Sequence, residues 1–200
     1  MSTGTRKDLI ILVADKDAEQ TLHGLLKRNH SLGIREITYD IIIHTNRDNG
    51  CATNSVEYLR IFLKNYTYAI TVFDKDGSGQ EHEQSTKLYS ELKENLQKNG
   101  WENRCEVIII EPELEQWIWA SSNKLPAIIS WNGDYNTIQN WLTEKGMWLQ
   151  NQTKPSKPKE SFQMCLRRTQ TRVSSSLFLQ IAEQISFKNC TDTSFNLLKN

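Results

Sequence analysis

Blocks of apolar and polar residues alternate along the first half of the chain. Short apolar runs rich in β-branched residues, which predict buried strands, lie at 8–14, 34–44, 68–74 and 105–110. Segments with helical spacing or helix-start residues lie between them, at 18–29, 53–63 and 81–99. Strands separated by helices need crossover connections, which favour parallel pairing. The pattern therefore predicts an α/β fold with a mainly parallel central sheet of about four strands flanked by helices.

The pattern changes after Pro112. All six tryptophans lie between positions 101 and 148, and we interpret them as packing residues of a helical cap rather than as a surface for base stacking. Two prolines in 152–159 predict a linker or ordered loop, and 161 to about 187 predicts one or two closing helices. We therefore expect two parts: an α/β core at 1–112, and a Trp-rich helical extension at 113–200 that packs on it.

The composition indicates a globular protein. Hydrophobic residues make up 38% of the chain and charged residues 24%, and no apolar run approaches the roughly 20 residues that a membrane span needs. The four cysteines are far apart and form neither a metal-type pair nor a disulfide framework, which fits a reducing compartment. The first residues do not resemble a secretory signal. We expect a cytoplasmic protein without a membrane partner.

Charge is unevenly distributed although the formal net charge is zero. The segment 154–172 contains six basic residues and one acid, a net charge of +5, so the remainder carries −5. This asymmetry suits a protein that binds a polyanion. We expect the phosphate backbone of a nucleic acid to be held by Lys157, Lys159, Arg167 and Arg168. The alternative is a solvated surface whose charges pair with neighbouring acids.

Acidic residues follow three of the predicted strands. Asp15 follows the first strand, Asp74 and Asp76 follow the third, and Glu111 or Glu115 follows the fourth. The carboxyl ends of parallel strands share one edge of the sheet, where ligands of open α/β sheets bind. Closely spaced carboxylates repel each other unless a cation lies between them, and Mg²⁺ or Mn²⁺ prefers oxygen ligands. The pattern predicts a divalent-metal site at this edge.

Two other interpretations fit the residues around Asp74. The letters Asp-Lys-Asp-Gly-Ser-Gly match the start of an EF-hand loop, but the twelfth position is Ser85 instead of glutamate, and a strand precedes the motif instead of a helix. The motif is also compatible with an ordinary acidic turn after a strand.

A carboxylate after the first strand and Asp-x-Asp after a later strand resemble the Toprim superfamily. The chain looks most similar to small single-domain Toprim proteins of the RloB-like and OLD-nuclease types found in bacterial defence systems. Glu115-Gln-Trp117 resembles their Glu-x-Trp motif, and the prolines and lysines of 155–159 resemble their Pro-Lys tail. The usual Glu-Gly after the first strand is Asp15-Lys16 here, which puts the role of the first carboxylate in doubt.

The resemblance implies a metal-dependent nuclease that hydrolyses nucleic-acid phosphodiesters in antiviral defence, without a choice between DNA and RNA. A partner from a defence operon, such as an ATPase, and an oligomer are compatible with it. Metal ligands would be Asp15, Asp74 and Asp76, and the catalytic set would add Glu19 and Glu115. His82 is a further candidate, although its sequence context fits a surface histidine better. Two alternatives remain: a non-catalytic regulatory or binding subunit of a defence complex, and a receiver-like signalling domain with Asp74 as the phosphorylated residue.

Overall fold

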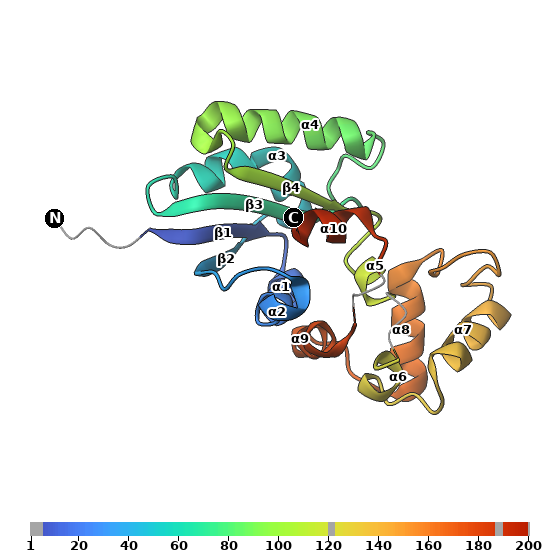
Figure 1. Cartoon of the computed structure of the whole chain (residues 1–200). Coiled ribbons are helices and arrows are strands. Elements are labelled where there is room, and N and C mark those ends of the chain that lie inside the picture. Colours follow the sequence, from blue (N-terminus) through green and yellow to red (C-terminus); the bar gives the residue numbers. More distant parts are fainter. Residues whose placement is uncertain (1–5, 120–122, 187–189, 200) are drawn as a thin grey trace.

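The computed structural model of the chain describes residues 6–119, 123–186 and 190–199. It is an α/β structure built on a four-stranded, all-parallel sheet in the order β2-β1-β3-β4, with helices on both faces (Figure 1). The strands are β1 (Lys7–Val13), β2 (Tyr39–Ile43), β3 (Tyr66–Asp74) and β4 (Cys105–Ile110). The predicted α/β class and parallel sheet of about four strands are confirmed.

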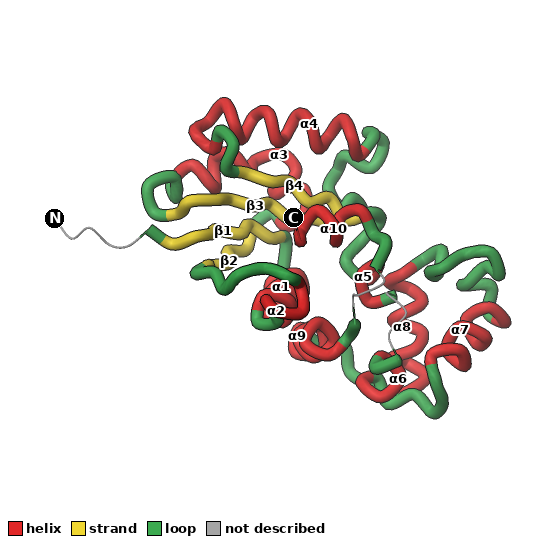
Figure 2. The backbone as a smooth tube through the Cα atoms, in the orientation of Figure 1, coloured by secondary structure: helices red, strands yellow, loops and turns green. Residues whose placement is uncertain are grey.

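Helices make up most of the remaining secondary structure, as the backbone trace in Figure 2 shows. They are α1 (Lys16–Leu26), α2 (Asn29–Leu32), α3 (Arg47–Arg60), α4 (Ser85–Leu96), the π-helical turn η1 (Gln97–Trp101), α5 (Glu115–Ile118), α6 (Leu125–Ile128), α7 (Tyr135–Glu144), α8 (Pro158–Thr169), α9 (Ser175–Gln184) and α10 (Thr193–Lys199). The predicted one or two closing helices are α8 and α9, while Phe187, their expected end, lies outside the described residues.

The two central strands carry the core. Ile11 of β1 pairs with Ile41 on one side and with Ile70 on the other, and its side chain is fully buried. One face of the sheet packs against α3 and α4, and the other against α1 and α10. Helix α9 packs against α1, so the cluster on this face continues into the C-terminal helices. Burial on both faces explains why these strands are continuous apolar runs. Because all four strands are parallel, their carboxyl ends form a single edge.

Several element boundaries differ from the sequence prediction, and three of them have a clear physical interpretation. Strand β2 begins only at Tyr39, because the Asp8 carboxylate binds Arg35 and Thr38 and holds 34–38 by side-chain contacts. Helix α3 begins at Arg47, so the predicted helix start at position 53 is wrong. Helix α8 begins at Pro158. A proline fits the first turn of a helix because the backbone N–H groups there have no acceptor within the helix, so the N–H that proline lacks is not needed.

The misplaced start of α3 has a local cause. Asn54 has non-helical backbone angles (φ −134°, ψ 16°) and marks a kink inside the helix. The hydroxyl of Thr53 donates to the Asn49 carbonyl (2.7 Å) and therefore does not cap a helix start. The Thr-Asn-Ser sequence that resembles an N-terminal cap is thus an irregularity within one longer helix.

The C-terminal tryptophans pack into the core. Trp117, Trp119 and Trp148 are buried, and the rings of Trp119 and Trp148 meet edge to face with centroids 5.6 Å apart. The buried indole N–H groups find partners, since Trp117 donates to Ser194 (2.9 Å) and Trp119 donates to the Pro158 carbonyl (3.0 Å). These bonds connect α5 to α8 and α10. No helix among the described residues is both long and apolar enough to cross a membrane.

Candidate active site

A cavity of about 210 Å³ opens at the carboxyl edge of the sheet. Acidic side chains from five separate positions line it, together with one lysine and one arginine. These residues are Asp15, Asp17, Asp48, Asp74, Glu115, Lys159 and Arg47. They come from the ends of β1 and β3 and from the first residues of α1, α3, α5 and α8. The parallel sheet brings together residues that are up to 144 positions apart.

Asp15 is the N-cap of α1. Its backbone is extended (φ −155°, ψ −175°), and its Oδ1 accepts hydrogen bonds from the backbone N–H groups of Asp17 (3.0 Å) and Ala18 (2.9 Å). An aspartate directly after a strand starts the following helix in this way. Asp17 accepts a hydrogen bond of 2.5 Å from Ser175 at the start of α9. The C-terminal helices therefore contribute to the wall of the cavity.

Asp48 fixes the end of β3. Its Oδ1 accepts a hydrogen bond of 2.8 Å from the backbone N–H of Asp74. The neighbouring Asn49 donates from Nδ2 to the Ser78 carbonyl (2.9 Å), so the start of α3 is tied to the loop after β3 at two points. Asp48 was missed in the sequence because the helix was predicted to begin only at position 53. An acid in the first turn after the second strand was the signal that could have identified it.

Asp76 is exposed and does not line the cavity. The chain turns away after Lys75, and the backbone N–H of Asp76 donates to the Pro112 carbonyl (3.0 Å). Gly77 and Gly79 have positive φ angles (85° and 73°) and complete the turn. The structure thus brings Asp74 together with Asp15 but not with Asp76.

Lys159 is held at the cavity by a buried acid. Glu113 is 6% exposed, and its carboxylate accepts hydrogen bonds from the backbone N–H (3.0 Å) and from the ammonium (3.2 Å) of Lys159. The ammonium therefore has a defined position next to Glu115 and Asp74, whose charges also stabilise it. Glu113 was missed in the sequence, although the alternate spacing of acids at 111, 113 and 115 was a possible signal.

The pKa values of four of the cavity acids are shifted in the same direction. Burial raises the pKa of Asp74 well above its ordinary value, and the nearby Asp48 raises it further. Burial also raises the pKa of Glu115 to about 7, and it raises the pKa values of Asp17 and Asp48. Burial alone would lower the pKa of Lys159, but the surrounding acids raise it on balance. The cavity therefore favours uptake of protons or of a cation.

Two further predicted residues lie away from the cavity lining. Glu19 forms an ion pair with Lys16 and does not line the cavity. His82 is exposed, and its Nε2 lies 3.6 Å from Oε1 of Glu83. Glu111, the alternative acid after β4, accepts a hydrogen bond from Ser85 (2.7 Å) on the outer side of the strand end.

The basic residues of 154–172 separate into groups in the structure. Lys154 pairs with Asp192 (3.2 Å), and the exposed Lys157 precedes α8. Arg167 is eight residues beyond Lys159, about 12 Å along the helix axis. Arg168 lies over the rings of two tryptophans, with its guanidinium carbon 5.1 Å from the Trp131 centroid and 4.8 Å from the Trp141 centroid. The two ends of α8 thus carry separate basic groups.

The carboxylates suit a hard cation by their chemistry and their unbalanced charge. Within the described ranges, however, no three His, Cys, Asp or Glu side chains are arranged closely enough to hold a metal ion. Comparison of the chain with protein families, with curated proteins and with solved structures found no match in any of the three.

Proposed function

We propose that this protein is a Toprim-like, divalent-metal-dependent nuclease that hydrolyses nucleic-acid phosphodiesters. One observation carries the proposal: carboxylates from the ends of β1 and β3 and from the start of α3 line one cavity beside a fixed lysine. The carboxylates after β1 and β3 are the part of the Toprim pattern that supports the proposal, while Asp76, the second acid of the Asp-x-Asp pair, lies outside the cavity lining. A role in antiviral defence rests on the sequence resemblance.

Mg²⁺ keeps several of its water ligands and needs only one or two protein carboxylates, so it does not require three converging acids. Among Asp15, Asp48 and Asp74, which line the cavity, Asp74 with either of the other two would hold Mg²⁺ or Mn²⁺. A bound divalent ion would polarise the phosphate and lower the pKa of an attacking water. The resemblance also implies Asp76 as a metal ligand. Its exposed side chain does not line the cavity, so this role stays a prediction.

The remaining cavity residues supply proton transfer and phosphate binding. The raised pKa of Glu115, about 7, allows it to accept a proton and release it again near neutral pH. Lys159 and Arg47 can bind the phosphate oxygens, and Glu113 keeps the lysine in place for this role. Removing the carboxylate of Glu115 should therefore slow hydrolysis more than it weakens nucleic-acid binding.

The replacement of the usual Glu-Gly by Asp15-Lys16 does not block the cavity. The ammonium of Lys16 pairs with the mostly buried Glu19 instead of with Asp15. Asp15 uses Oδ1 for both of its capping bonds. A carboxylate that is shorter by one methylene thus combines helix capping with a position at the cavity.

A second candidate is a non-catalytic regulatory or binding subunit of a defence complex. The observation that favours it is the lack of three closely converging ligands among the described residues. Such a protein would keep the acidic edge as a contact surface for a partner. The two candidates differ in whether purified protein cleaves nucleic acid with Mn²⁺.

The test combines calorimetry with a cleavage assay. Wild-type protein is titrated with Mn²⁺ and then incubated with labelled single-stranded and duplex DNA and RNA. We expect Mn²⁺ binding and cleavage that are both lost in Asp74→Asn and in Asp48→Asn, and retained in the exposed control Glu57→Gln. Asp76→Asn determines whether the exposed acid also participates.

Cleavage that persists in Asp74→Asn, or in excess chelator, would contradict the assignment. Mn²⁺ binding without cleavage of any of the four substrates would favour the regulatory candidate.

A further inference from the structure

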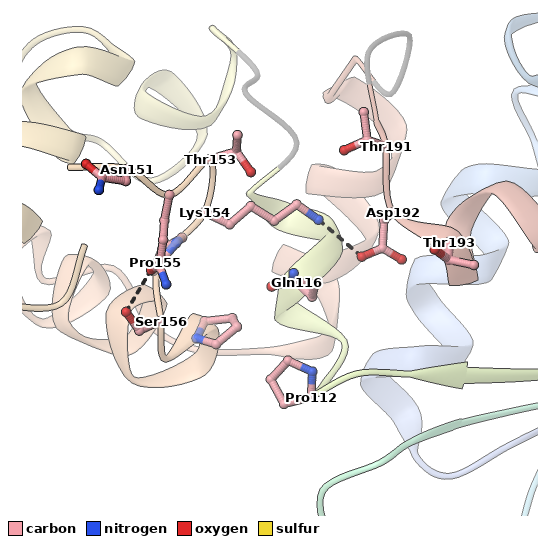
Figure 3. Close-up of a pocket in the computed structure, with 12 residues that line it drawn as sticks. Pro112, Gln116, Asn151, Thr153, Lys154, Pro155, Ser156, Thr191, Asp192 and Thr193 are labelled. Atoms are coloured by element: carbon pink, nitrogen blue, oxygen red, sulfur yellow. Dashed lines mark hydrogen bonds and ion pairs between the residues drawn. The ribbon is translucent and has the colours of Figure 1, made fainter. Parts of the chain in front are cut away.

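A second cavity, of about 570 Å³, has the lining residues drawn in Figure 3. Its walls come from three stretches of chain: the connection after β4, the loop before α8, and the segment that leads into α10. Figure 3 shows Gln116 on α5 between the loop residues and the segment of Thr191 and Thr193. Its size is within the range of pockets for small organic ligands.

The two cavities are neighbours along the same two stretches of chain. Pro112 and Gln116 line the larger cavity, while Glu115, between them in sequence, lines the acidic cavity. Likewise Pro158 lines the larger cavity, and the next residue, Lys159, lines the acidic one. A nucleic-acid strand with a phosphate at Lys159 would therefore bring an adjacent nucleotide to the larger cavity.

The charges of the larger cavity balance each other. Its charged lining residues are Lys154 and Asp192, which form an ion pair of 3.2 Å with side chains only 13% and 12% exposed. Figure 3 shows this pair bridging the loop and the segment before α10. Asp192 is held further by hydrogen bonds from Ser194 and from the Phe195 N–H. A neutral lining favours an uncharged, hydrogen-bonding ligand over a free phosphate.

The loop wall is fixed before any ligand binds. The Trp148 indole donates to the Gln152 carbonyl (2.8 Å), and the Ser156 hydroxyl donates to the Gln152 side-chain oxygen (2.9 Å). The Ser156 N–H also donates to the Met147 carbonyl (3.2 Å). A preformed wall reduces the conformational entropy that the protein loses when a ligand binds.

The uncharged groups of this cavity suit a nucleobase. Gln116 and Asn151 supply amides, which hydrogen-bond to base edges, and three prolines supply apolar ring surface. The amide oxygen of Gln116 is buried and has no hydrogen-bond partner among the described residues. The geometry points to a base-binding subsite for a single-stranded nucleic acid whose neighbouring phosphate lies at the acidic cavity. This inference rests on the proposed function, because it takes the same strand as its ligand.

Binding in the absence of metal tests the subsite separately from cleavage. A dye-labelled single-stranded DNA and its RNA counterpart are titrated with full-length protein in EDTA, and fluorescence anisotropy is measured. The variant Gln116→Ala/Asn151→Ala is compared with Gln180→Ala/Asn136→Ala, a control with the same substitutions at exposed positions outside the cavity. We expect about tenfold weaker binding for the cavity variant, because two hydrogen bonds are lost, and wild-type affinity for the control.

An abasic strand identifies the part of the ligand that is bound. Replacing every base of the DNA by an abasic site should remove the difference between the cavity variant and wild type, because only backbone contacts remain. Near-ultraviolet circular dichroism checks that both variants fold.

Three results would overturn the subsite. The two double variants could bind with equal affinity, or the cavity variant could lose as much affinity for the abasic strand as for the normal strand. Wild type could also bind neither the DNA nor the RNA strand. Cleavage would still test the nuclease by itself. A protein that shows the expected binding pattern but never cleaves would disprove the nuclease and retain the subsite.

Discussion

Glu115 is a buried acid whose charge the fold does not fully balance. It is 7% exposed, and burial raises its pKa from 4.5 to about 7. Folded Glu115 holds its proton more tightly than unfolded Glu115, so the folded state binds more protons between these two pH values. The free energy of unfolding therefore falls as pH rises through this window. The variant Glu115→Gln keeps the shape of the side chain and removes this dependence.

The size of the effect follows from the pKa shift. A change of one pKa unit corresponds to about 1.4 kcal/mol, so the rise from 4.5 to about 7 corresponds to about 3 kcal/mol. Below pH 4.5 wild type and Glu115→Gln should be about equally stable. Above pH 7 the variant should be more stable by up to about 3 kcal/mol, which is roughly 6–12 °C in melting temperature for a chain of this size.

Urea unfolding at a series of pH values from 4 to 8, in EDTA, measures the difference. The exposed Glu57→Gln is the matched control and should follow wild type at every pH. If divalent ions bind the same cavity, Mn²⁺ should stabilise wild type at pH 8 and reduce the advantage of Glu115→Gln. A constant difference between variant and wild type from pH 4 to pH 8 would refute the reasoning.

Three other predictions concern packing and charge. Gly24→Ala should destabilise the protein by about 1–2 kcal/mol in urea unfolding, because the added Cβ would lie 2.7 Å from the Ala182 Cβ where α1 meets α9; unchanged stability would show that the helices can separate freely. Lys154→Met should cost about 3 kcal/mol by leaving Asp192 buried without its cation, and adding Asp192→Asn should recover part of the loss; no recovery would show that the charge is not the cause. Removing all four charges at Lys157, Lys159, Arg167 and Arg168 should weaken binding to nucleic acid of any sequence. It should also reduce the slope of log affinity against log salt concentration by about one per phosphate contact. An unchanged slope would exclude this segment from the binding surface.

The strands and their acidic ends were predictable because the physics that sets them is local. Residues 105–110 form a β-branched apolar run, and the strand β4 occupies the same residues. Asp15 and Asp74 follow such runs directly, so their place at one edge follows from parallel pairing alone. Asp76 shows the limit of this reasoning. One turn, set by the bond from its N–H to the Pro112 carbonyl, directs it away from the cavity.

The sequence by itself determined the fold class, the parallel sheet and the acidic character of one sheet edge, because apolar periodicity and strand-end position depend on near neighbours. The tertiary structure decided which acids meet. Asp48 reaches the site because α3 begins early and its carboxylate binds the Asp74 N–H, and Lys159 reaches it because the buried Glu113, 46 positions away, holds both its backbone and its ammonium. Such contacts join residues distant in the sequence, and their geometry depends on how the C-terminal helices pack against the sheet.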